Sequence, residues 1–384
     1  MRVLAAFDKF KDSLTAGQAC SVTATTLRER HPDWMVDVCP LTDGGDGFCE
    51  ILTAAVGGTL EYFSVTGPRG ELVRAPIGFV DFEKIPPAAR ALLRIAEAPV
   101  TRLAIVEMAA ASGLALLPES QRDPWKASSV GTGQLLRHAA ERGATGVLLG
   151  VGGSATHDLG LGVLQALGVE SHSTTGAPLT PAVPENWPAI ARFHGQVEKN
   201  FPVIRIACDV SNPLLGPLGA AAIYAPQKGL QPADYTRLES ETQRVAALLV
   251  SQCGQDDGLA KTPGTGAAGG IAFGLMAAAG AQIVAGFPLV SAWLDLEARL
   301  ADADLVLTGE GRFDPSSFHG KGPGAIVNRA LELGKRVHVF AGAVGENQSA
   351  TAVSLHAITP PGATLGEALR LAPTNLAKAL RGVF

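Results

Sequence analysis

The stretch VLLGVGGSATHDLG, residues 147–160, determines how the fold of this chain is predicted. It begins as an apolar run typical of a buried strand and opens into a glycine-rich turn followed by Ser, Thr, His and Asp. Residues Gly150 to Ala155 fit the pattern G-x-G-x-x-A, and Glu170 lies twenty residues after Gly150. Taken alone, this spacing is that of a dinucleotide-binding loop with its ribose-binding acid.

The residues after these glycines do not continue as a dinucleotide-binding loop would. Such a loop runs directly into an apolar helix. Here a threonine, a histidine and an aspartate intervene, and Gly160 and Gly162 interrupt the segment that follows. Because glycines let backbone N–H groups approach an anion closely, we interpret the loop as a cradle for a phosphate or a substrate carboxylate, not as a nicotinamide site.

The composition predicts a two-domain protein with buried strands. The chain has 384 residues, of which 47% are hydrophobic and only 17% charged, and it contains 45 glycines. This length exceeds one ordinary core, and low charge with abundant glycine favours buried parallel strands joined by tight loops. The formal net charge is −5 and no basic run is long, so we expect no nucleic-acid partner.

The cysteines and the N-terminal residues indicate a reducing, cytoplasmic location. The five cysteines are scattered without a C-x-x-C pair, which is typical of small hydrophobic residues in a reducing compartment. The N-terminal stretch MRVLAAFDKFKDS meets charged residues too early for a signal peptide. No apolar stretch is long enough to cross a bilayer, so we expect no membrane partner.

Apolar runs alternate with helical patterns along the chain. The predicted strands are residues 2–7, 35–40, 103–108, 146–151, 203–208, 304–309 and 336–342, and the predicted helices include those that follow Thr15 and those at 132–143, 235–252 and 324–336. Thr15 with Gln18 forms the pattern of a capping box. Alternating strands and helices predict an α/β protein with parallel sheets.

Polar residues gather after five of the predicted strands. They are DKFKDS (8–13), TDGGDG (42–47), GGSATHD (152–158), the Asp, Ser and Asn within 209–212, and GEGRFD (309–314) followed by HGK (319–321). Ligands bind at the carboxyl ends of strands in open parallel sheets. Glycines and lysines suit phosphate, and carboxylates beside a phosphate require a hard cation such as Mg²⁺ between them. This combination predicts phosphoryl transfer.

Several of these residues also have ordinary structural alternatives. Asp43 is suited to an Asx turn and Asp158 to a helix N-cap, while residues 310–314 could form a salt-bridged turn. The sequence lacks the motifs of the two large kinase classes: no G-x-x-x-x-G-K-[ST] motif occurs, and no H-R-D with D-F-G occurs.

The order of the motifs resembles a known family. Nine motifs follow one another in an order that resembles the bacterial type-1 glycerate kinases. They are DKFKDSLTA, LTDGGDG, EMAAASGL, GTGQLL, GVGGSATHD, ACDVSNPLLGPLGAA, PQKG, GTGAAGG and LTGEGRFDPSSFHGKGP. The resemblance implies ATP-dependent phosphorylation of D-glycerate, on the 2-hydroxyl, to give 2-phosphoglycerate and ADP.

The resemblance also implies two α/β domains with the active site in the cleft between them. One is a Rossmann-like domain with a parallel sheet built from both chain ends, predicted as residues 1–66 plus 286–384. The other is an inserted α/β domain, predicted as residues 67–285. Some residues depart from the family pattern: Lys9 and Asp12 replace the usual Ser and Gly of P-D-S-F-K-G-S, His157 replaces an Asn, and Asp46 stands where Glu is usual.

The expected site residues follow from these motifs. We expect Asp209 to accept the proton of the glycerate hydroxyl, with Asp158 as the second candidate base. Lys11, Arg312 and Lys321 would neutralise the ATP phosphates and the glycerate carboxylate, and Asp43 and Asp314 would hold Mg²⁺. The remaining candidate contacts to ATP or glycerate are Asp8, Ser13, Gly152, Gly153, Ser154, Asn212, Glu310 and His319.

Two other functions fit part of the sequence. The G-x-G-x-x-A spacing with Glu170 allows a dinucleotide-dependent oxidoreductase of a small hydroxy acid. A glycerate-binding regulator that has lost catalysis is the alternative outside enzymes, although the retained carboxylates argue against it.

Overall fold

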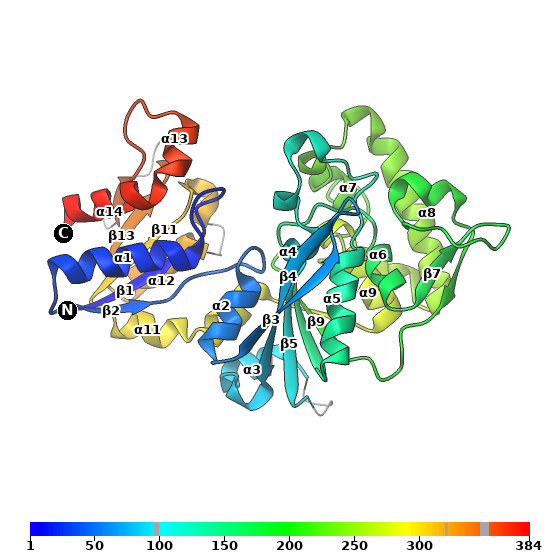
Figure 1. Ribbon diagram of the computed structural model, residues 1–384, viewed down its shortest axis with the longest axis horizontal. Coiled ribbons are helices and arrows are strands. Elements are labelled where there is room, and N and C mark those ends of the chain that lie inside the picture. Colours follow the sequence, from blue (N-terminus) through cyan, green and yellow to red (C-terminus); the bar gives the residue numbers. More distant parts are fainter. Residues whose placement is uncertain (96–99, 319–321, 346–352) are drawn as a thin grey trace. The chain divides into compact units, whose positions relative to one another are not determined.

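The chain forms two compact units of the α/β class. The computed structural model describes residues 1–95, 100–318, 322–345 and 353–384 (Figure 1). The first unit comprises residues 1–43 with 290–384, and the second comprises residues 44–289. The predicted α/β class is confirmed, and all seven predicted strands are present.

The first unit is built on a five-stranded parallel sheet in the order β15-β13-β11-β1-β2. Its strands are β1 (Arg2–Phe7), β2 (Met35–Val38), β11 (Leu305–Gly309), β13 (Arg336–Ala341) and β15 (Val353–Ala357). Val3 pairs with Leu305 on one side and Val36 on the other, so the two ends of the chain share one sheet (Figure 1).

Helices bury the apolar face of this sheet. They are α1 (Ala16–Arg30), α11 (Leu296–Asp302), α12 (Gly322–Glu332), α13 (Leu365–Arg370) and α14 (Ala372–Val383). The predicted capping box of α1 is confirmed, because the side chains of Thr15 and Gln18 each accept a hydrogen bond from the other's backbone N–H. α1 lies beside α14, and Leu27 and Leu376 are both buried in the core they share (Figure 1).

The strand order of the first unit reverses between β1 and β11. The chain leaves β1 for β2 on one side, whereas β11 leads to β13 and β15 on the other. Ligands in such sheets bind outside the carboxyl ends of the strands at this reversal. Residues that follow Phe7 and Gly309 therefore occupy the position where a ligand is expected.

The second unit contains a six-stranded mixed sheet in the order β10-β9-β6-β5-β4-β3. Its strands are β3 (Thr59–Thr66), β4 (Leu72–Asp81), β5 (Arg102–Glu107), β6 (Gly146–Gly150), β9 (Val203–Ala207) and β10 (Gln282–Val284). β3 and β4 pair in antiparallel fashion, and β4 pairs antiparallel with β5, whereas the other neighbours are parallel. β3 thus belongs to the second sheet, so the division between units falls after Asp43 and not near residue 66.

Helices and short strands complete the second unit. The helices are α2 (Phe48–Ala55), α3 (Pro87–Leu93), α4 (Met108–Ser112), α5 (Val130–Glu141), α6 (Leu161–Ala166), α7 (Ala220–Ile223), α8 (Tyr235–Cys253) and α9 (Ile271–Ala279), and β7 (Val169–His172) pairs with β8 (Arg192–Gly195). α10 (Gly286–Trp293) joins the second unit to the first along the chain. The minor strands β12 (Arg312–Phe313) and β14 (Ala343–Val344) pair with each other in the first unit.

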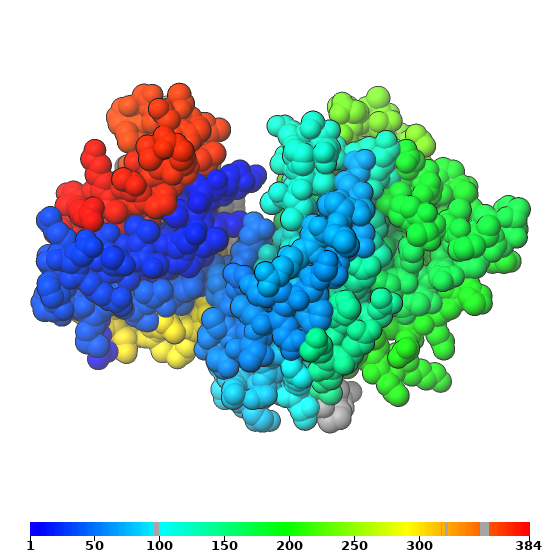
Figure 2. Space-filling model, viewed as in Figure 1, coloured from blue at the N-terminus to red at the C-terminus, as the bar shows by residue number. Residues whose placement is uncertain are grey.

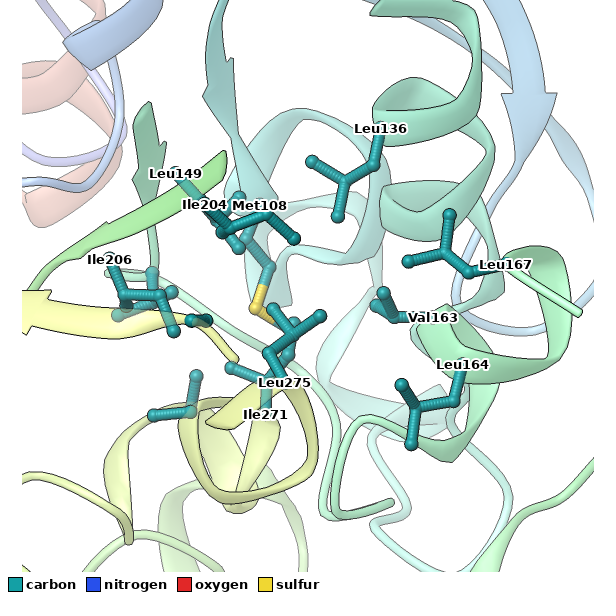
Figure 3. Packing of buried hydrophobic residues seen from close by; sticks show 14 of the residues in the cluster. Met108, Leu136, Leu149, Val163, Leu164, Leu167, Ile204, Ile206, Ile271 and Leu275 are labelled. Atoms are coloured by element: carbon teal, nitrogen blue, oxygen red, sulfur yellow. The ribbon is translucent and has the colours of Figure 1, made fainter. Parts of the chain in front are cut away.

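The core of the second unit is fully buried beneath these helices. Leu149 and Ile204, from neighbouring strands, pack toward Leu136 of α5, Val163 of α6 and Ile271 of α9 (Figure 3). The β3–β4 hairpin lies at the surface in Figure 2, which agrees with the alternating exposure of β3. Within the described ranges, none of the helices combines the length and apolar character that a membrane crossing needs.

Candidate active site

A cavity of about 770 Å³ lies at the carboxyl ends of the first-unit strands. It is lined by residues 8–13 after β1, Asp43 after β2, residues 310–312 after β11, and residues 342–343 after β13. The structure therefore brings together Asp8, Lys11, Ser13, Asp43, Glu310 and Arg312, which were predicted from separate motifs. Their meeting point is the reversal of strand order between β1 and β11.

The loop after β1 is a tight, internally bonded turn. The backbone N–H groups of Ser13 and Leu14 both donate to the carbonyl of Phe10, and the Ser13 hydroxyl donates to the same oxygen. Asp12 has a φ of 61°, in the left-handed region that glycine adopts most readily. Aspartate tolerates this region better than most residues, so the turn keeps its shape here without glycine.

The pKa of the Glu310 carboxyl lies above its ordinary value. Burial raises the pKa of Glu310 to about 7; a hydrogen bond from Ser317 opposes this rise, and the charges of Asp8, Asp314 and Asp43 add to it. Its Oε1 atom is buried, and no group of the described chain forms a hydrogen bond with it. A positive ion in this cavity would stabilise the charged form of the carboxyl.

Arg312 and Asp314 form the salt-bridged turn that the sequence left open. The Arg312 Nε donates to Asp314 Oδ2 at 3.1 Å, and the Arg312 side chain is 70% exposed. Asp314 is half-buried and also accounts for part of the raised pKa of Glu310. His319 and Lys321, two further predicted site residues, lie outside the described residues.

A second part of the cavity wall is apolar apart from Thr359, and it was not predicted. It comes from the segment after β15 and from α13 and the start of α14, namely Ile358, Thr359, Ala363, Leu365, Ala368, Leu369 and Ala372. Small and aliphatic residues are ordinary in such segments, so nothing in the sequence distinguished them from core residues. A cavity with one polar and one apolar wall suits a ligand that is charged at one end and flat and apolar at the other.

In the second unit, two glycine-rich loops cross at the carboxyl end of β6. The N–H of Gly152 donates to the carbonyl of Gly44 at 3.0 Å. A Cβ atom on Gly152 would lie 2.7 Å from the Cα of Gly45, and one on Gly150 would lie 2.6 Å from the carbonyl oxygen of Gly44. Only glycine permits this approach, which fixes the motifs DGGDG and GVGGS against each other.

Glu107 and Asp209 end the strands on either side of β6. Glu107 is the last residue of β5 and is buried, and its Oε2 accepts a hydrogen bond from the Cys49 N–H at 3.3 Å. Asp209 follows β9 and is exposed; both of its carboxylate oxygens accept from the Phe287 N–H at the start of α10. The carboxylate of Asp209 is therefore held in place and accessible to a ligand.

Asn212 lies in the loop after β9, and both ends of its side-chain amide form hydrogen bonds with nearby residues. Its amide nitrogen donates to the Leu218 carbonyl at 2.8 Å, and its amide oxygen accepts from the Tyr224 hydroxyl at 2.6 Å. These bonds give Asn212 a structural role in shaping the segment between β9 and α7.

Asp158 is fully buried and satisfied by four hydrogen bonds. Its carboxylate accepts from the backbone N–H and the hydroxyl of Ser129 and from the N–H groups of Gly160 and Gly162. Burial raises its pKa, and these hydrogen bonds oppose the rise. The bonds anchor the start of α6, as an N-terminal cap does.

His157 and Lys228 are buried beneath the same loop. The His157 Nε2 lies 3.0 Å from the Thr242 hydroxyl, and burial lowers the pKa of His157 to about 3, with a further contribution from Lys228. The Lys228 Nζ donates to the Ser154 hydroxyl at 2.9 Å and to the Thr156 carbonyl at 2.6 Å. Lys228 belongs to the motif PQKG, to which the sequence assigned no role; its burial is a tertiary property.

The described carboxylates and histidines do not converge on a preformed metal site: among the residues that the structure describes, no group of three His, Cys, Asp or Glu could hold a metal ion. Mg²⁺ bound with a nucleotide needs only one or two protein carboxylates, because phosphate oxygens and water supply the remaining ligands.

A model of the glycerate kinase family matches residues 3–384. The chain belongs to the glycerate kinase family. It is 36% identical to a glycerate 2-kinase of Escherichia coli K12, covering 100% of this chain and 97% of the relative. It is 33% identical to a glycerate kinase of Halalkalibacterium halodurans, covering 99% of this chain and 97% of the relative.

A solved structure extends the likeness to the fold. The crystal structure of a protein described as glycerate kinase 2 from Salmonella typhimurium LT2 matches with a TM-score of 0.74 at 36% identity, covering 100% of this chain and 97% of the other. The family resemblance predicted from the motifs is therefore confirmed, and this glycerate kinase family member is a phosphotransferase. The interpretation as a dinucleotide-dependent oxidoreductase is accordingly abandoned.

Proposed function

We propose that this enzyme transfers the terminal phosphate of ATP to the 2-hydroxyl of D-glycerate, giving 2-phosphoglycerate and ADP. The observation that carries the proposal is the cavity at the strand reversal of the first unit, in a member of the glycerate kinase family. The name of the Escherichia coli relative, glycerate 2-kinase, supports the choice of the 2-hydroxyl.

The first-unit cavity is the proposed nucleotide site. Its volume of about 770 Å³ lies within the range of small-molecule sites. Its apolar wall, which includes Ile358 and Leu369, would pack against the base. Lys9 and Lys11 line the same cavity together with Gly311, and their charges would neutralise the phosphates.

The acidic residues of this cavity fit a magnesium ion bound with the nucleotide. Asp8, Asp43 and Glu310 line it, and burial, with a smaller contribution from the charges of Asp8, Asp314 and Asp43, raises the pKa of Glu310. A divalent cation bound here would stabilise the charged carboxyl. We propose Asp43 and Asp314 as the carboxylates that hold Mg²⁺, directly or through water, with Asp8 and Glu310 beside them. The ion would neutralise charge on the phosphate oxygens.

Asp209 is the proposed base. It follows a parallel strand at the carboxyl edge of the second-unit sheet and is exposed, whereas Asp158 is buried and uses its oxygens on four internal donors. A base must reach the acceptor hydroxyl, so exposure favours Asp209 over Asp158. The glycine-rich loop 152–154, which follows the neighbouring parallel strand β6, is the proposed site of the glycerate carboxylate.

We propose that the phosphoryl group is transferred in one displacement step. The oxygen on C2 of glycerate forms a bond to the terminal phosphorus as the bond from that phosphorus to the ADP oxygen breaks. The hydroxyl proton passes to the Asp209 carboxylate, and the charge on ADP is met by Lys9 and Lys11. Positioning and charge neutralisation supply most of the rate enhancement in this kind of reaction.

The test is ADP release from Mg·ATP with D-glycerate, L-glycerate, tartronate or no acceptor, followed by phosphorus NMR of the product. The proposal predicts Mg²⁺-dependent turnover with D-glycerate and a phosphate on the 2-oxygen. A phosphate on the 3-oxygen would contradict the position, and no turnover above the sample without acceptor would contradict the function.

A further inference from the structure

Lys228 is a buried lysine without an ion-pair partner in the described chain. Its side chain is among the largest fully buried ones, with 1% of the residue exposed. An ammonium in such surroundings loses its hydration and normally requires a compensating charge. Its two hydrogen bonds go instead to neutral oxygens, those of the Ser154 side chain and the Thr156 backbone.

The groups that face Lys228 come from the loop above it. His157 is neutral because burial lowers its pKa to about 3, and the Lys228 charge contributes to this. The charge of Asp158 acts on Lys228, but the Asp158 carboxylate already accepts hydrogen bonds from Ser129, Gly160 and Gly162. Burial lowers the pKa of Lys228 to about 7, although Asp158 opposes the shift.

The loop held by Lys228 is shaped for an anion. In the described part of the chain, no protein group accepts a hydrogen bond from the N–H of Gly153 or Ser154. Gly153 is exposed with a φ of 70°, and Ser154 is 8% exposed. Because the Ser154 oxygen accepts from Lys228, its own O–H is available to donate outward.

An acid also lies close to this loop. The Asp46 Oδ1 lies 3.5 Å from the position that a Cβ of Gly153 would occupy. Its negative charge opposes binding of an anion at the loop. The ammonium beneath Ser154 brings a positive charge to the same loop, which favours an anion there.

We propose that Lys228 is a positioning residue for the acceptor. Its ammonium orients the Ser154 hydroxyl and supplies a positive charge beneath the 152–154 loop. The loop therefore binds the acceptor's carboxylate, and the enzyme takes up a proton as it does so. The inference rests on the proposed function, because it takes glycerate as the acceptor. It adds to that function a residue that controls acceptor affinity without touching the reacting atoms.

The proposal fixes the sign of the pH dependence. A bound carboxylate stabilises the ammonium and raises the pKa of Lys228 above its value in the free enzyme. Below pH 7 the ammonium is already present, so glycerate binds without proton uptake. Above pH 7 binding must also protonate Lys228, so glycerate affinity falls as pH rises, by about tenfold per pH unit at most.

The test is calorimetric titration of the full-length enzyme with D-glycerate alone and with Mg·ADP alone between pH 6.5 and pH 8.5. Glycerate does not itself ionise over this range. We expect glycerate affinity to fall about tenfold or more from pH 7 to pH 8.5. We expect Lys228→Met to weaken glycerate binding at pH 6.5 and to abolish the pH dependence, and Mg·ADP binding to keep its wild-type pH profile in this variant.

Two further variants separate positioning from folding. Ser154→Ala removes the hydroxyl and keeps the ammonium, so it should raise the KM for glycerate severalfold while retaining the fall in affinity with pH. Lys84→Met is the matched control, because Lys84 is an exposed lysine at the opposite edge of the same sheet, paired with Asp81. It should leave glycerate binding and kcat unchanged.

The outcomes distinguish this inference from the proposed function. Suppose that the wild type turns over glycerate. The inference alone would then be overturned if glycerate affinity did not depend on pH, or if Lys228→Met altered only Mg·ADP binding. If Lys228→Met does not fold, the wild-type titration and Ser154→Ala decide the matter. Absence of glycerate turnover by the wild type would overturn the proposed function, and with it the assignment of the carboxylate.

Discussion

The first-unit cavity and the second-unit loop both depend on glycines at the ends of parallel strands, but they bury groups of opposite charge. In the cavity, burial raises the pKa of the Glu310 carboxyl to about 7. Beneath the loop, burial lowers the pKa of the Lys228 ammonium to about 7. Burial opposes charge in both places, and an ion of the opposite sign would stabilise the charged form of each group. We infer that the cavity is suited to a cation with its nucleotide, and the loop to an anionic acceptor.

The largest expected effect separates two aspartates of the second unit. Asp209→Asn should lower kcat by about 10²–10⁴-fold, because the proposed base is lost while Asn can still accept from the Phe287 N–H. Steady-state kinetics at saturating substrates measure this loss. Near-normal turnover of the variant would remove Asp209 from the mechanism.

Asp158→Asn should act on folding. Its amide group offers one acceptor oxygen to four donors and places an NH₂ against N–H groups, which should cost about 2–4 kcal/mol of unfolding free energy. Urea denaturation measures the change. A variant of normal stability that has lost kcat would make Asp158 the base instead.

The cation side of the comparison is tested at Glu310. Binding of Mg·ATP should lower the pKa of Glu310, so below pH 7 binding releases a proton and nucleotide affinity rises as pH increases toward 7. In the wild type the apparent affinity should rise by about tenfold between pH 6 and pH 7.5, and Glu310→Gln should remove this rise. Nucleotide titrations at several pH values measure it. The same slope in wild type and variant would assign the proton to another group.

The crossing of the two glycine-rich loops gives a smaller effect. Gly152→Ala would place a Cβ at 2.7 Å from the Cα of Gly45, so the loop must shift, at a cost of about 1–3 kcal/mol. The KM for glycerate should rise by about tenfold, because the shift displaces the anion-binding N–H groups. Gly382→Ala, where no atom lies within 4 Å of the added Cβ, is the matched control and should leave the KM unchanged.

The smallest effect is expected at Asp12. Its φ of 61° is costly for a β-branched residue, so Asp12→Val should lower the unfolding free energy by about 1–2 kcal/mol. Asp12→Gly should change it by less than about 1 kcal/mol. Thermal unfolding of both variants measures the difference. Equal stability of the two variants would mean that the loop after β1 does not require the left-handed conformation.

The two regions also differ in how well the sequence predicts them. The seven predicted strands are short runs in which apolar residues predominate, and the capping box at Thr15 is a local pattern. The polar wall of the cavity was predictable because Asp8 and Glu310 follow such runs directly. Strand β4 was missed, since Pro76 and Gly78 interrupt its sequence.

The parts that the sequence could not predict depend on tertiary packing. Leu365 and Leu369 face a cavity only because α13 is placed against the end of the first sheet. Lys228 resembles a surface lysine in sequence, and only the packing of Ser154 and Thr156 over it makes it a buried cation. From the sequence, Asp158 could be either a catalytic base or a helix cap. The four hydrogen bonds that its carboxylate accepts in the structure favour the cap.

The most direct test of this account is the number of protons exchanged when each ligand binds alone, measured by calorimetry at pH 7.5 in buffers of different ionisation enthalpy. We predict that D-glycerate is bound with proton uptake and Mg·ATP with proton release. Lys228→Met should abolish the uptake, and Glu310→Gln should abolish the release. Exchange of the same sign for both ligands, or none for either, would contradict the claim that the two regions are prepared for opposite charges.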